Sequence, residues 1–465
     1  MILSLVCLLN LQFQTFDSTD SLTLVGLLES DLNFICFIVK TSKYNYIIER
    51  SNTGYWYNGI EHKYFTLPAN LSRKVEEMLK TQQGIALLPD LLINKLKSGG
   101  FIIPNETNEL DVIRVRNEER INQKDYLLII LPTLNCNYKC WYCIQDHIPS
   151  RMSLETIESI KKHIEYMVKI EQIKSLQIEW FGGEPFMYFN QIINPLCEYS
   201  KQICEEHNIP YLTTATTNGY FLYPPKIGNI KRAGFTRFQI TLDGPKQEHD
   251  KVKYQTNCES TFIHVLNNIE HILNNSTNIQ ILLRINYTEE NLNYQIVDDV
   301  NKIISPKNRC KIQINPKKVW QETIRKERYN NVVTLLDLFE ASGYRVNRLD
   351  LVWDFIPCYA NRKYYNAINF NGDVIKCTAC NDLYDKESHG SISDDGSIIW
   401  DRSFISKYQA KSFENEECLA CKYLPLCMGI CPRDYGSTSY CKFNSMDMKI
   451  EDALVNYINS MNKVK

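Results

Sequence analysis

"YLLIILPTLNCNYKCWYC", residues 126–143, joins a run of apolar residues to three closely spaced cysteines. The first eight residues, "YLLIILPT", are almost continuously apolar and reach a proline near their end. Such a run predicts a strand buried on both faces of a parallel sheet. Cys136, Cys140 and Cys143 follow in the loop at the carboxyl end of that strand. Because α/β folds gather their chemistry at the carboxyl ends of parallel strands, we expect a functional site here.

The segments that follow alternate between strand and helix patterns. "SLETIESIKKHIEYMVK" (153–169) has apolar residues at helical spacing and a plausible N-cap, Ser153. Its apolar stripe comprises Leu154, Ile157, Ile160, Ile164 and Met167. Further strands are expected at 175–181, 211–217, 238–243, 279–286 and 311–316, and further helices at 192–207, 261–273 and 330–342. The alternation predicts an α/β fold of repeated βαβ units, a partial (β/α)6 TIM-like barrel.

Composition limits the classes of partner and the compartment. The 465 residues carry a net charge of −2, which gives no electrostatic footprint for nucleic acid. The first residues, "MILSLVCLLNLQF", lack the basic start and cleavage site of a signal peptide, and the run is too short to cross a membrane. We therefore expect a cytoplasmic protein without a nucleic-acid or membrane partner. In a reducing compartment the seventeen cysteines favour metal or redox chemistry over disulfides.

The cysteines fall into two groups and a scattered remainder. Cys7, Cys36, Cys197, Cys204, Cys258 and Cys310 lie in apolar or helical contexts and are interpreted as small buried hydrophobes. One group is the triplet at 136–143. The other lies beyond residue 350 and comprises Cys358, Cys377, Cys380, Cys418, Cys421, Cys427, Cys431 and Cys441.

The triplet fits one kind of metal site better than another. A closed zinc site needs four ligands, and no fourth Cys or His stands at suitable spacing; His147 is the nearest. An iron–sulfur cubane can be held by three cysteines, which leaves one iron open for another ligand. The triplet therefore predicts a catalytic iron–sulfur cluster.

This stretch resembles the radical S-adenosylmethionine (SAM) superfamily, in which CxxxCxxC follows the first barrel strand. "FGGEP" (181–185), "TNG" (217–219), "TLDGPKQEHDKVK" (241–253) and "RIN" (284–286) resemble the family's other motifs, in the same order and on the expected strand ends. The resemblance implies that a [4Fe–4S] cluster is held by Cys136, Cys140 and Cys143. It implies SAM binding at Tyr142, Gly182, Gly183, Glu184, Asn218, Thr241, Lys253, Arg284 and Asn286.

Some of these residues have a physical reason for the role that the resemblance implies. Gly182 and Gly183 let the backbone approach the methionine part of SAM, and Glu184 can accept from its ammonium group. Tyr142 would lie against the adenine. Lys253 stands where the family usually has arginine; lysine keeps the charge but loses the bidentate fork.

The second cysteine group resembles the SPASM domain that follows the barrel in radical SAM enzymes acting on peptides. That resemblance covers seven cysteines and implies two auxiliary [4Fe–4S] clusters, three clusters in all. One would be held by Cys418, Cys421, Cys427 and Cys441, the other by Cys358, Cys377 and Cys431. A zinc ribbon is the alternative, but seven cysteines exceed one zinc site. The fourth ligand of the second cluster is either Cys380 or a cysteine of the substrate.

The segment before the barrel resembles the small winged-helix domain of ribosomal-peptide maturases. Strand patterns ("SLTLVGLLE", "NFICFIVK" and "YNYIIER") precede two helical stretches and "GFIIP". An unrelated α+β cap remains the alternative. The expected domains are 1–115 (α+β, leader-peptide recognition), 122–345 (radical SAM barrel), 350–450 (SPASM) and 451–465 (helix or tail).

The resemblances together imply an oxidoreductase that modifies a precursor peptide. An external donor such as flavodoxin or ferredoxin reduces the cluster, SAM is cleaved, and the 5′-deoxyadenosyl radical takes a hydrogen atom from a peptide residue, giving a thioether or carbon–carbon cross-link. One alternative is a formylglycine-generating enzyme like the anaerobic sulfatase maturases, which have aspartate where this chain has Thr378. The other is a non-enzymatic iron–sulfur electron carrier, which would not need the glycine-rich segments.

Overall fold

The computed structural model describes residues 39–319, 321, 328–346, 358–379, 389–409, 412–431, 441 and 449–463. The expected strand "SLTLVGLLE", most of "NFICFIVK", and Cys380 lie outside the described residues. Within them no helix is both long enough and apolar enough to cross a membrane.

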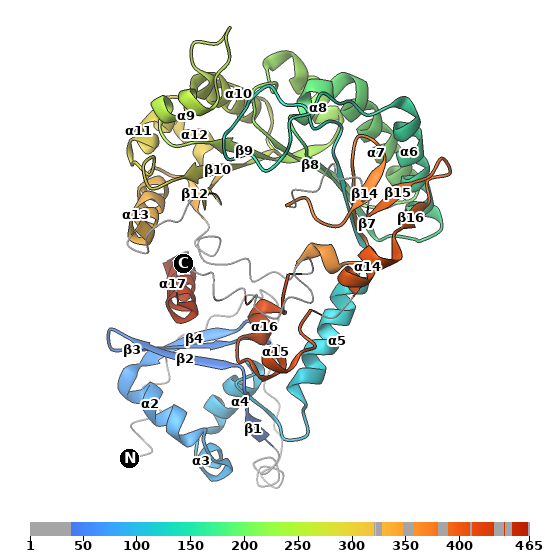
Figure 1. Ribbon diagram of the computed structural model, residues 1–465. Coiled ribbons are helices and arrows are strands. Elements are labelled where there is room, and N and C mark those ends of the chain that lie inside the picture. Colours follow the sequence, from blue (N-terminus) through green and yellow to red (C-terminus); the bar gives the residue numbers. More distant parts are fainter. Residues whose placement is uncertain are drawn as a thin grey trace.

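Six parallel strands form the centre of the molecule, and neighbours in sequence are neighbours in the sheet. They are β6 (Asp125–Ile130), β7 (Ser175–Trp180), β8 (Tyr211–Thr217), β9 (Phe235–Leu242), β10 (Gln280–Tyr287) and β11 (Ile312–Lys318). The α-helices of this part are α6 (Leu154–Lys169), α7 (Asn194–Glu206), α8 (Ile227–Arg232), α9 (Lys246–Val252), α10 (Thr261–Asn275), α11 (Gln295–Asn301), α12 (Pro306–Arg309) and α13 (Arg328–Ala341). Short turns η2 (Pro185–Tyr188), η3 (Phe189–Ile193) and η4 (Pro224–Lys226) complete it. Figure 1 shows the helices along the outer face of a curved sheet, which confirms the predicted open barrel.

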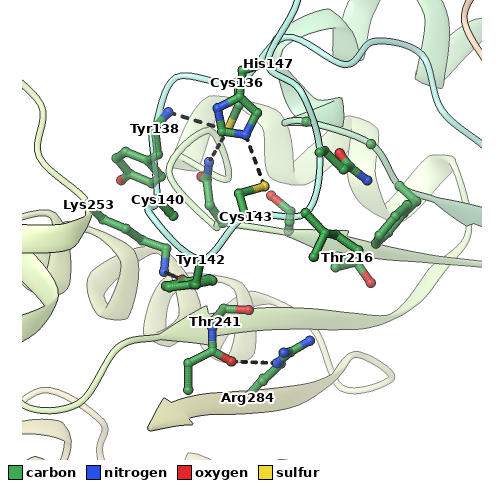
Figure 2. Close-up of a pocket in the computed structure, with 18 of the residues that line it drawn as sticks. Cys136, Tyr138, Cys140, Tyr142, Cys143, His147, Thr216, Thr241, Lys253 and Arg284 are labelled. Carbon is green, nitrogen blue, oxygen red and sulfur yellow. Dashed lines mark hydrogen bonds between the residues drawn. The ribbon is translucent and has the colours of Figure 1, made fainter. Parts of the chain in front are cut away.

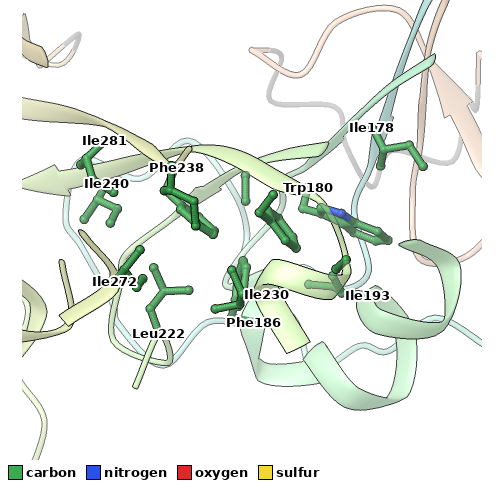
Figure 3. Close-up of a cluster of buried hydrophobic side chains, with 14 of the residues drawn as sticks. Ile178, Trp180, Phe186, Ile193, Leu222, Ile230, Phe238, Ile240, Ile272 and Ile281 are labelled. Atoms are coloured by element: carbon green, nitrogen blue, oxygen red, sulfur yellow. The ribbon is translucent and has the colours of Figure 1, made fainter. Parts of the chain in front are cut away.

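The two faces of the barrel strands differ in chemistry. On β7, Ile178 and Trp180 enter the core between sheet and helices, where they meet Phe186 and Phe238 (Figure 3). Because side chains alternate along a strand, Gln177 and Glu179 point to the inner face. The inner face therefore carries polar groups, and the apolar core lies outside the barrel.

Helix α6 forms as the sequence predicts, with one exception. Ser153 Oγ accepts a hydrogen bond from the backbone N–H of Thr156 at 3.1 Å, so it is the N-cap. The expectation that Leu154 belongs to the buried stripe is wrong, because 71% of Leu154 is exposed. A helical side chain points back toward the N-terminus, so at the first position it extends past the helix end instead of onto the sheet.

The amino-terminal part is a small α+β unit. Strands β2 (Asn45–Arg50), β3 (Thr53–Asn58) and β4 (Tyr64–Pro68) form an antiparallel sheet, and β1 (Val39–Thr41) pairs with β5 (Ile102–Pro104). Helices α2 (Ala69–Met78), α3 (Gln82–Ala86) and α4 (Asp90–Ser98) pack on one face of the sheet over a core that includes Trp56, Phe65 and Phe101. Helix α5 (Glu109–Asn122) leads from this unit to the barrel.

The carboxyl-terminal cysteine-rich part continues the barrel sheet. Strand β12 (Arg345–Val346) pairs with β11, and β13 (Tyr365–Ile368) pairs in parallel with β6. From β13 the sheet continues antiparallel through β14 (Asp373–Ile375), β15 (Gly390–Ile392) and β16 (Ile398–Trp400). The short helices are η5 (Tyr359–Asn361), α14 (Arg402–Gln409), α15 (Glu416–Ala420) and α16 (Leu424–Cys427). The barrel and the cysteine-rich part are therefore consecutive in sequence but share one sheet, whereas the strands of the amino-terminal unit form separate sheets.

The last helix, α17 (Ile450–Lys463), packs on the amino-terminal sheet. Its Leu454 and Ile458 are fully buried against Tyr46, Ile48 and Tyr57 of β2 and β3. Tyr46 also stacks on Tyr423 at 5.7 Å between ring centroids. The face of the sheet opposite helices α2 to α4 is thus covered by the end of the chain (Figure 1).

Candidate active site

A cavity opens at the carboxyl ends of the barrel strands. Its wall contains every residue that the sequence proposed for the first cluster and SAM except Glu184: Cys136, Cys140, Tyr142, Cys143, Gly182, Gly183, Asn218, Thr241, Lys253, Arg284 and Asn286. Figure 2 shows how the cysteine loop faces Thr216, Thr241 and Arg284 across this space. The strand ends therefore gather into one site motifs that lie far apart in sequence.

The cysteine loop is tightly turned and its thiols are partly buried. The backbone N–H of Cys143 donates to the carbonyl of Cys140 at 3.0 Å, and that of Tyr138 donates to Cys136 Sγ at 3.4 Å. Burial, and next the negative charge of Glu184, raise the pKa of Cys136 to about 12. His147 Nε2 lies 3.2 Å from Cys143 Sγ, which places this histidine in the cavity wall.

The arrangement of the three thiols is not that of a mononuclear site. Among the residues that the structure describes, no three Cys, His, Asp or Glu side chains converge where one metal ion could bind. In a cubane each thiolate binds a different iron, so the ligands stand farther apart than around a single ion. Three cysteines in one cavity wall fit the donor set of a cubane.

The glycines form a cradle that a side chain would fill. A Cβ on Gly183 would lie 2.2 Å from the carbonyl oxygen of Asn135, and one on Gly182 would lie 2.4 Å from that of Thr133. Gly182 also has φ +121°, a conformation that glycine adopts freely. In the same wall, Gln145 Oε1 is buried without a hydrogen-bond partner among the described residues. Close backbone and an unpaired polar atom fit a bound polar ligand such as the methionine part of SAM.

Glu184 is placed differently from what its sequence motif suggested. It is fully buried, and its carboxylate accepts hydrogen bonds from Phe186 N, Asn218 N and Thr217 Oγ1 at 2.8–2.9 Å. Burial raises its pKa to about 7, although these bonds lower it. The described structure does not place Glu184 in the cavity wall; it ties the glycine segment to the end of β8.

Lys253 of the cavity wall is held in a buried hydrogen-bond network. Its ammonium group pairs with Asp243, with both side chains at least 97% buried, and donates to Tyr142 Oη at 3.0 Å. Tyr142 Oη in turn donates to Asp243 Oδ1 at 2.6 Å. Burial disfavours the charged lysine, but Asp243 and Tyr142 outweigh it and raise the pKa of Lys253. The network fixes the ring of Tyr142, the residue between two cluster cysteines.

Arg284 and Asn286 stand side by side on β10. Arg284 Nε donates to Asn286 Oδ1 at 2.7 Å, and Asn286 Nδ2 lies 3.4 Å from Asp243 Oδ1. Arg284 borders the cavity, where its guanidinium can bind a carboxylate.

Several wall residues were not anticipated from the sequence. They are Tyr138, Ile144, Gln145, Phe181, Thr216, Thr217, Val319 and Gln321, with Asp243 behind them. Thr216 and Thr217 end the strand before "NG" and Asp243 belongs to "TLDGP", so their positions in motifs could have indicated them. Gln321, which donates to the Tyr142 carbonyl at 2.6 Å, follows a strand end and carries no motif.

The carboxyl-terminal cysteines lie in two places. Burial raises the pKa of Cys418, and Cys421 and Cys441 are near enough to raise it further. Cys358 and Cys377 both act on Tyr359, beside β13. The assignment of these cysteines, with Cys427 and Cys431, to two clusters stays a prediction.

Comparison with known proteins supports the interpretation from geometry. Residues 130–294 match the model of the radical SAM superfamily. The chain is 24% identical over 400 residues to the radical SAM cyclopropyl synthase TigE of Paramaledivibacter caminithermalis, a match covering 77% of this chain and 80% of that protein. It is 28% identical over 160 residues to a cysteine-type anaerobic sulfatase-maturating enzyme of Clostridium novyi, covering 32% and 41%.

Solved structures share the fold. The protein anSMEcpe with bound AdoMet superimposes with a TM-score of 0.51 at 20% identity, over 73% of this chain and 100% of the other. The same protein with AdoMet and the Kp18Cys peptide gives a TM-score of 0.50 at 18% identity, over 72% and 99%. Residues 130–294 of the chain therefore form a radical SAM domain, which implies SAM and an iron–sulfur cluster as its cofactors.

Proposed function

We propose that this enzyme modifies a ribosomally made precursor peptide by forming a new bond within it. The observation that carries the proposal is the cavity at the carboxyl ends of the barrel strands, in a sheet that continues into the cysteine-rich part. The bound peptide of anSMEcpe, whose fold this chain shares, supports a peptide as substrate.

The chain's own residues would bind and orient the cofactors. Cys136, Cys140 and Cys143 would hold the cluster, Gly182 and Gly183 would admit the methionine part of SAM, and Arg284 would pair with its carboxylate. Tyr142, held by Lys253 and Asp243, would lie against the adenine. When bound, SAM and the reduced cluster supply a radical that abstracts hydrogen; an external flavodoxin or ferredoxin would supply the electron.

Two further cubanes are proposed for the carboxyl-terminal part. One would be bound by Cys418, Cys421, Cys427 and Cys441, and the other by Cys358, Cys377 and Cys431. The proximity of Cys418 to Cys421 and Cys441, and of Cys358 to Cys377, supports this division. The fourth ligand of the second set, Cys380 or a substrate cysteine, stays open because Cys380 lies outside the described residues.

The amino-terminal unit is proposed to bind the leader of the precursor. Within the described residues β2 and β4 each pair only with β3, so each offers a free edge for strand addition. Leader binding there would raise the local concentration of the core segment at the cavity. The leader should therefore lower the KM for the precursor relative to a leaderless core peptide.

Carbon–carbon bond formation is favoured over a thioether. The relative that matches over most of both chains is a cyclopropyl synthase. Formylglycine formation, suggested by the sulfatase-maturating relative, would need a base where this chain has Thr378. Mass spectrometry separates these outcomes: a new internal bond removes two hydrogens, while formylglycine formation replaces the cysteine thiol.

The proposal is tested by cofactor content and turnover. Anaerobically reconstituted enzyme should bind about twelve irons, and changing Cys136, Cys140 and Cys143 together to Ala should remove about four. The same triple variant should release no 5′-deoxyadenosine from SAM and dithionite. Wild-type protein that forms no 5′-deoxyadenosine would be an electron carrier, and the proposed function would be wrong.

A further inference from the structure

The inner face of the barrel carries a carboxyl group without an assigned role. Glu179 of β7 lies in register with Ile129 of β6 and with Thr214 of β8. Its chain neighbours Ile178 and Trp180 are buried outside the barrel, so the Glu179 side chain points inward. The Glu179 residue is neither fully buried nor exposed.

One hydrogen bond connects this carboxyl group to the SAM cavity. Thr216 Oγ1 donates to Glu179 Oε1 at 3.3 Å, and Thr216 is part of the cavity wall. Gln239 Nε2 lies 3.4 Å from Thr216 Oγ1 and holds the threonine from the other side. Glu179 is therefore one hydrogen bond away from a residue of the cavity wall.

The opposite side of Glu179 faces the cysteine-rich part. The rings of Tyr359 and Tyr365 lie 4.6 Å apart, and the charge of Glu179 reaches both. The charges of Cys358 and Cys377 reach the same two rings. Ile129, which is in register with Glu179, belongs to one buried cluster with Tyr365 and Cys377, so Glu179 lies on the part of the sheet next to the cysteine-rich part.

The charged and titratable groups around Glu179 come from three elements. They are Arg237 of β9, Tyr359 of η5 and Tyr365 of β13. Burial raises the pKa of Glu179, while Arg237 and the bond from Thr216 lower it by less. A carboxylate with a raised pKa is a stronger base than one in water.

Other polar groups near the cavity are less suited to accept a proton. Asp243 is bound in the ion pair with Lys253, and Glu184 is fully buried with its carboxylate held by hydrogen bonds from Phe186, Thr217 and Asn218. The Thr378 hydroxyl, 3.3 Å from Tyr359 Oη, is a weak base.

We propose that Glu179 is the base that accepts the proton released when the substrate peptide forms its new bond. The proposal rests on the peptide-modifying function proposed above. Joining two groups that each carry a hydrogen removes two hydrogens in total. One leaves the peptide as a hydrogen atom, which the radical derived from SAM takes up. The other leaves as a proton to Glu179, and the remaining electron passes to an oxidised iron–sulfur cluster of this chain.

The test is Glu179→Gln, which keeps the size of the side chain and an acceptor for Thr216 but removes its basicity. The dissociation constants for SAM and for the precursor peptide should stay within about twofold, whereas bond formation should fall by about 10²–10⁴-fold. 5′-Deoxyadenosine should still form with peptide, because hydrogen abstraction precedes proton loss. In D2O with a thiol reductant, unmodified peptide recovered from the variant should carry deuterium at the abstracted position.

The matched control is Gln177→Asn. Gln177 lies two residues earlier on the same inward face of β7 and contacts Thr214 at 3.4 Å, as Glu179 contacts Thr216. Turnover by this control should equal that of the wild type. The infrared difference between wild type and Glu179→Gln identifies the carboxyl band of Glu179. This band should titrate over the same pH range in which product formation by the wild type falls at low pH. The pH profile of the variant should lack this fall.

Different results would overturn different claims. Product formation by Glu179→Gln at the wild-type rate would overturn the assignment of the base, and so would a proportional loss of peptide affinity and 5′-deoxyadenosine. Wild-type enzyme that makes 5′-deoxyadenosine but never a peptide product would overturn the peptide-modifying function, and this assignment with it.

Discussion

Two glycines and one buried ion pair shape the cavity at the level of single residues. Gly182 and Gly183 bring the backbone close to the cysteine loop, and the Lys253–Asp243 pair holds Tyr142. Packing and hydrogen bonds among the chain's own residues therefore organise this part of the site.

Gly183→Ala should abolish SAM binding. The new Cβ would meet the Asn135 carbonyl at 2.2 Å, and backbone cannot yield as a flexible side chain can. SAM affinity measured by calorimetry on the reconstituted enzyme should fall at least tenfold. The control is Gly228→Ala in α8, where the Cβ meets nothing within 4 Å and alanine favours the helix. Equal affinities in both variants would contradict the cradle.

Lys253→Met should destabilise the fold strongly. It leaves the Asp243 carboxylate buried without its partner, which costs about 3–5 kcal/mol in the free energy of unfolding. Lys251→Met is the control, because the Lys251 side chain is 69% exposed and its pairing with Glu248 contributes at most about 1 kcal/mol. Urea unfolding of both variants measures the difference. A smaller loss for Lys253 than for Lys251 would refute the structural role of the buried pair.

The sequence predicted the place of a residue in the cavity where a motif contains that residue. It could not predict the direction in which a side chain points. The three cysteines and the glycines reach the cavity because they follow the ends of β6 and β7, and Arg284 reaches it from the last half of β10. Glu184 belongs to the same motif as the glycines, yet its carboxylate turns toward the end of β8. Glu179 is one polar position in a strand that alternates apolar and polar residues. Its nearness to Tyr359, far away in sequence, could not be predicted from that pattern.

At the scale of elements, the hairpin of β15 and β16 is joined to the barrel through a buried histidine. His163 of α6 shares a 2.7 Å hydrogen bond with Tyr126 Oη through Nε2, and its Nδ1 lies 2.8 Å from the Gly396 carbonyl. Burial lowers the pKa of His163 to about 4. The neutral imidazole therefore connects the first barrel strand, the first helix and the hairpin.

Stability should fall on acidification because of His163. Its pKa is lower in the folded chain than in the unfolded chain, where about 6.5 is usual, so its contribution is present above pH 6.5 and is lost as the pH falls toward 4. Between pH 6.5 and 5 the free energy of unfolding should decrease by about 2 kcal/mol more in the wild type than in His163→Gln. Urea unfolding at several pH values measures this, with the exposed His207→Gln as control. Parallel losses in wild type and His163→Gln would exclude the effect.

The pairing of β13 with β6 could not be predicted from sequence patterns. The helices and strands of the barrel follow local periodicity, and their predicted positions agree with the structure within a few residues. Parallel pairing between β6 and β13 joins segments more than two hundred residues apart. No local signal encodes such a partner, since it depends on the loop-rich segment between them.

At the scale of the whole molecule, the first unit and the last helix stabilise each other. Leu454 and Ile458 of α17 fill the apolar face formed by Tyr46, Ile48 and Tyr57. Removal of residues 1–115 would therefore also uncover α17. The leader-binding proposal is best tested with single substitutions in the full chain.

Leu454→Ala should loosen the amino-terminal sheet. Leu454 is fully buried, and truncation of such a side chain costs about 2–5 kcal/mol. Hydrogen exchange at residues 45–58 should accelerate, while exchange in the barrel strands stays unchanged. Asn459→Ala, an exposed position on the same helix, is the control and should leave exchange unchanged. Equal protection in Leu454→Ala and wild type would show that α17 does not support the sheet.

Because the last helix covers the first sheet, one face of that sheet stays exposed while the rest of the chain is synthesised. Roughly 380 residues separate the end of β4 from the start of α17. At about 5–20 residues per second, a ribosome needs on the order of 20–80 s to make them. During that interval the tyrosine-rich face of the nascent sheet is exposed to solvent. Chaperones bind surfaces of this kind. A messenger cut short before codon 450 would yield a chain that keeps this face open for as long as it survives.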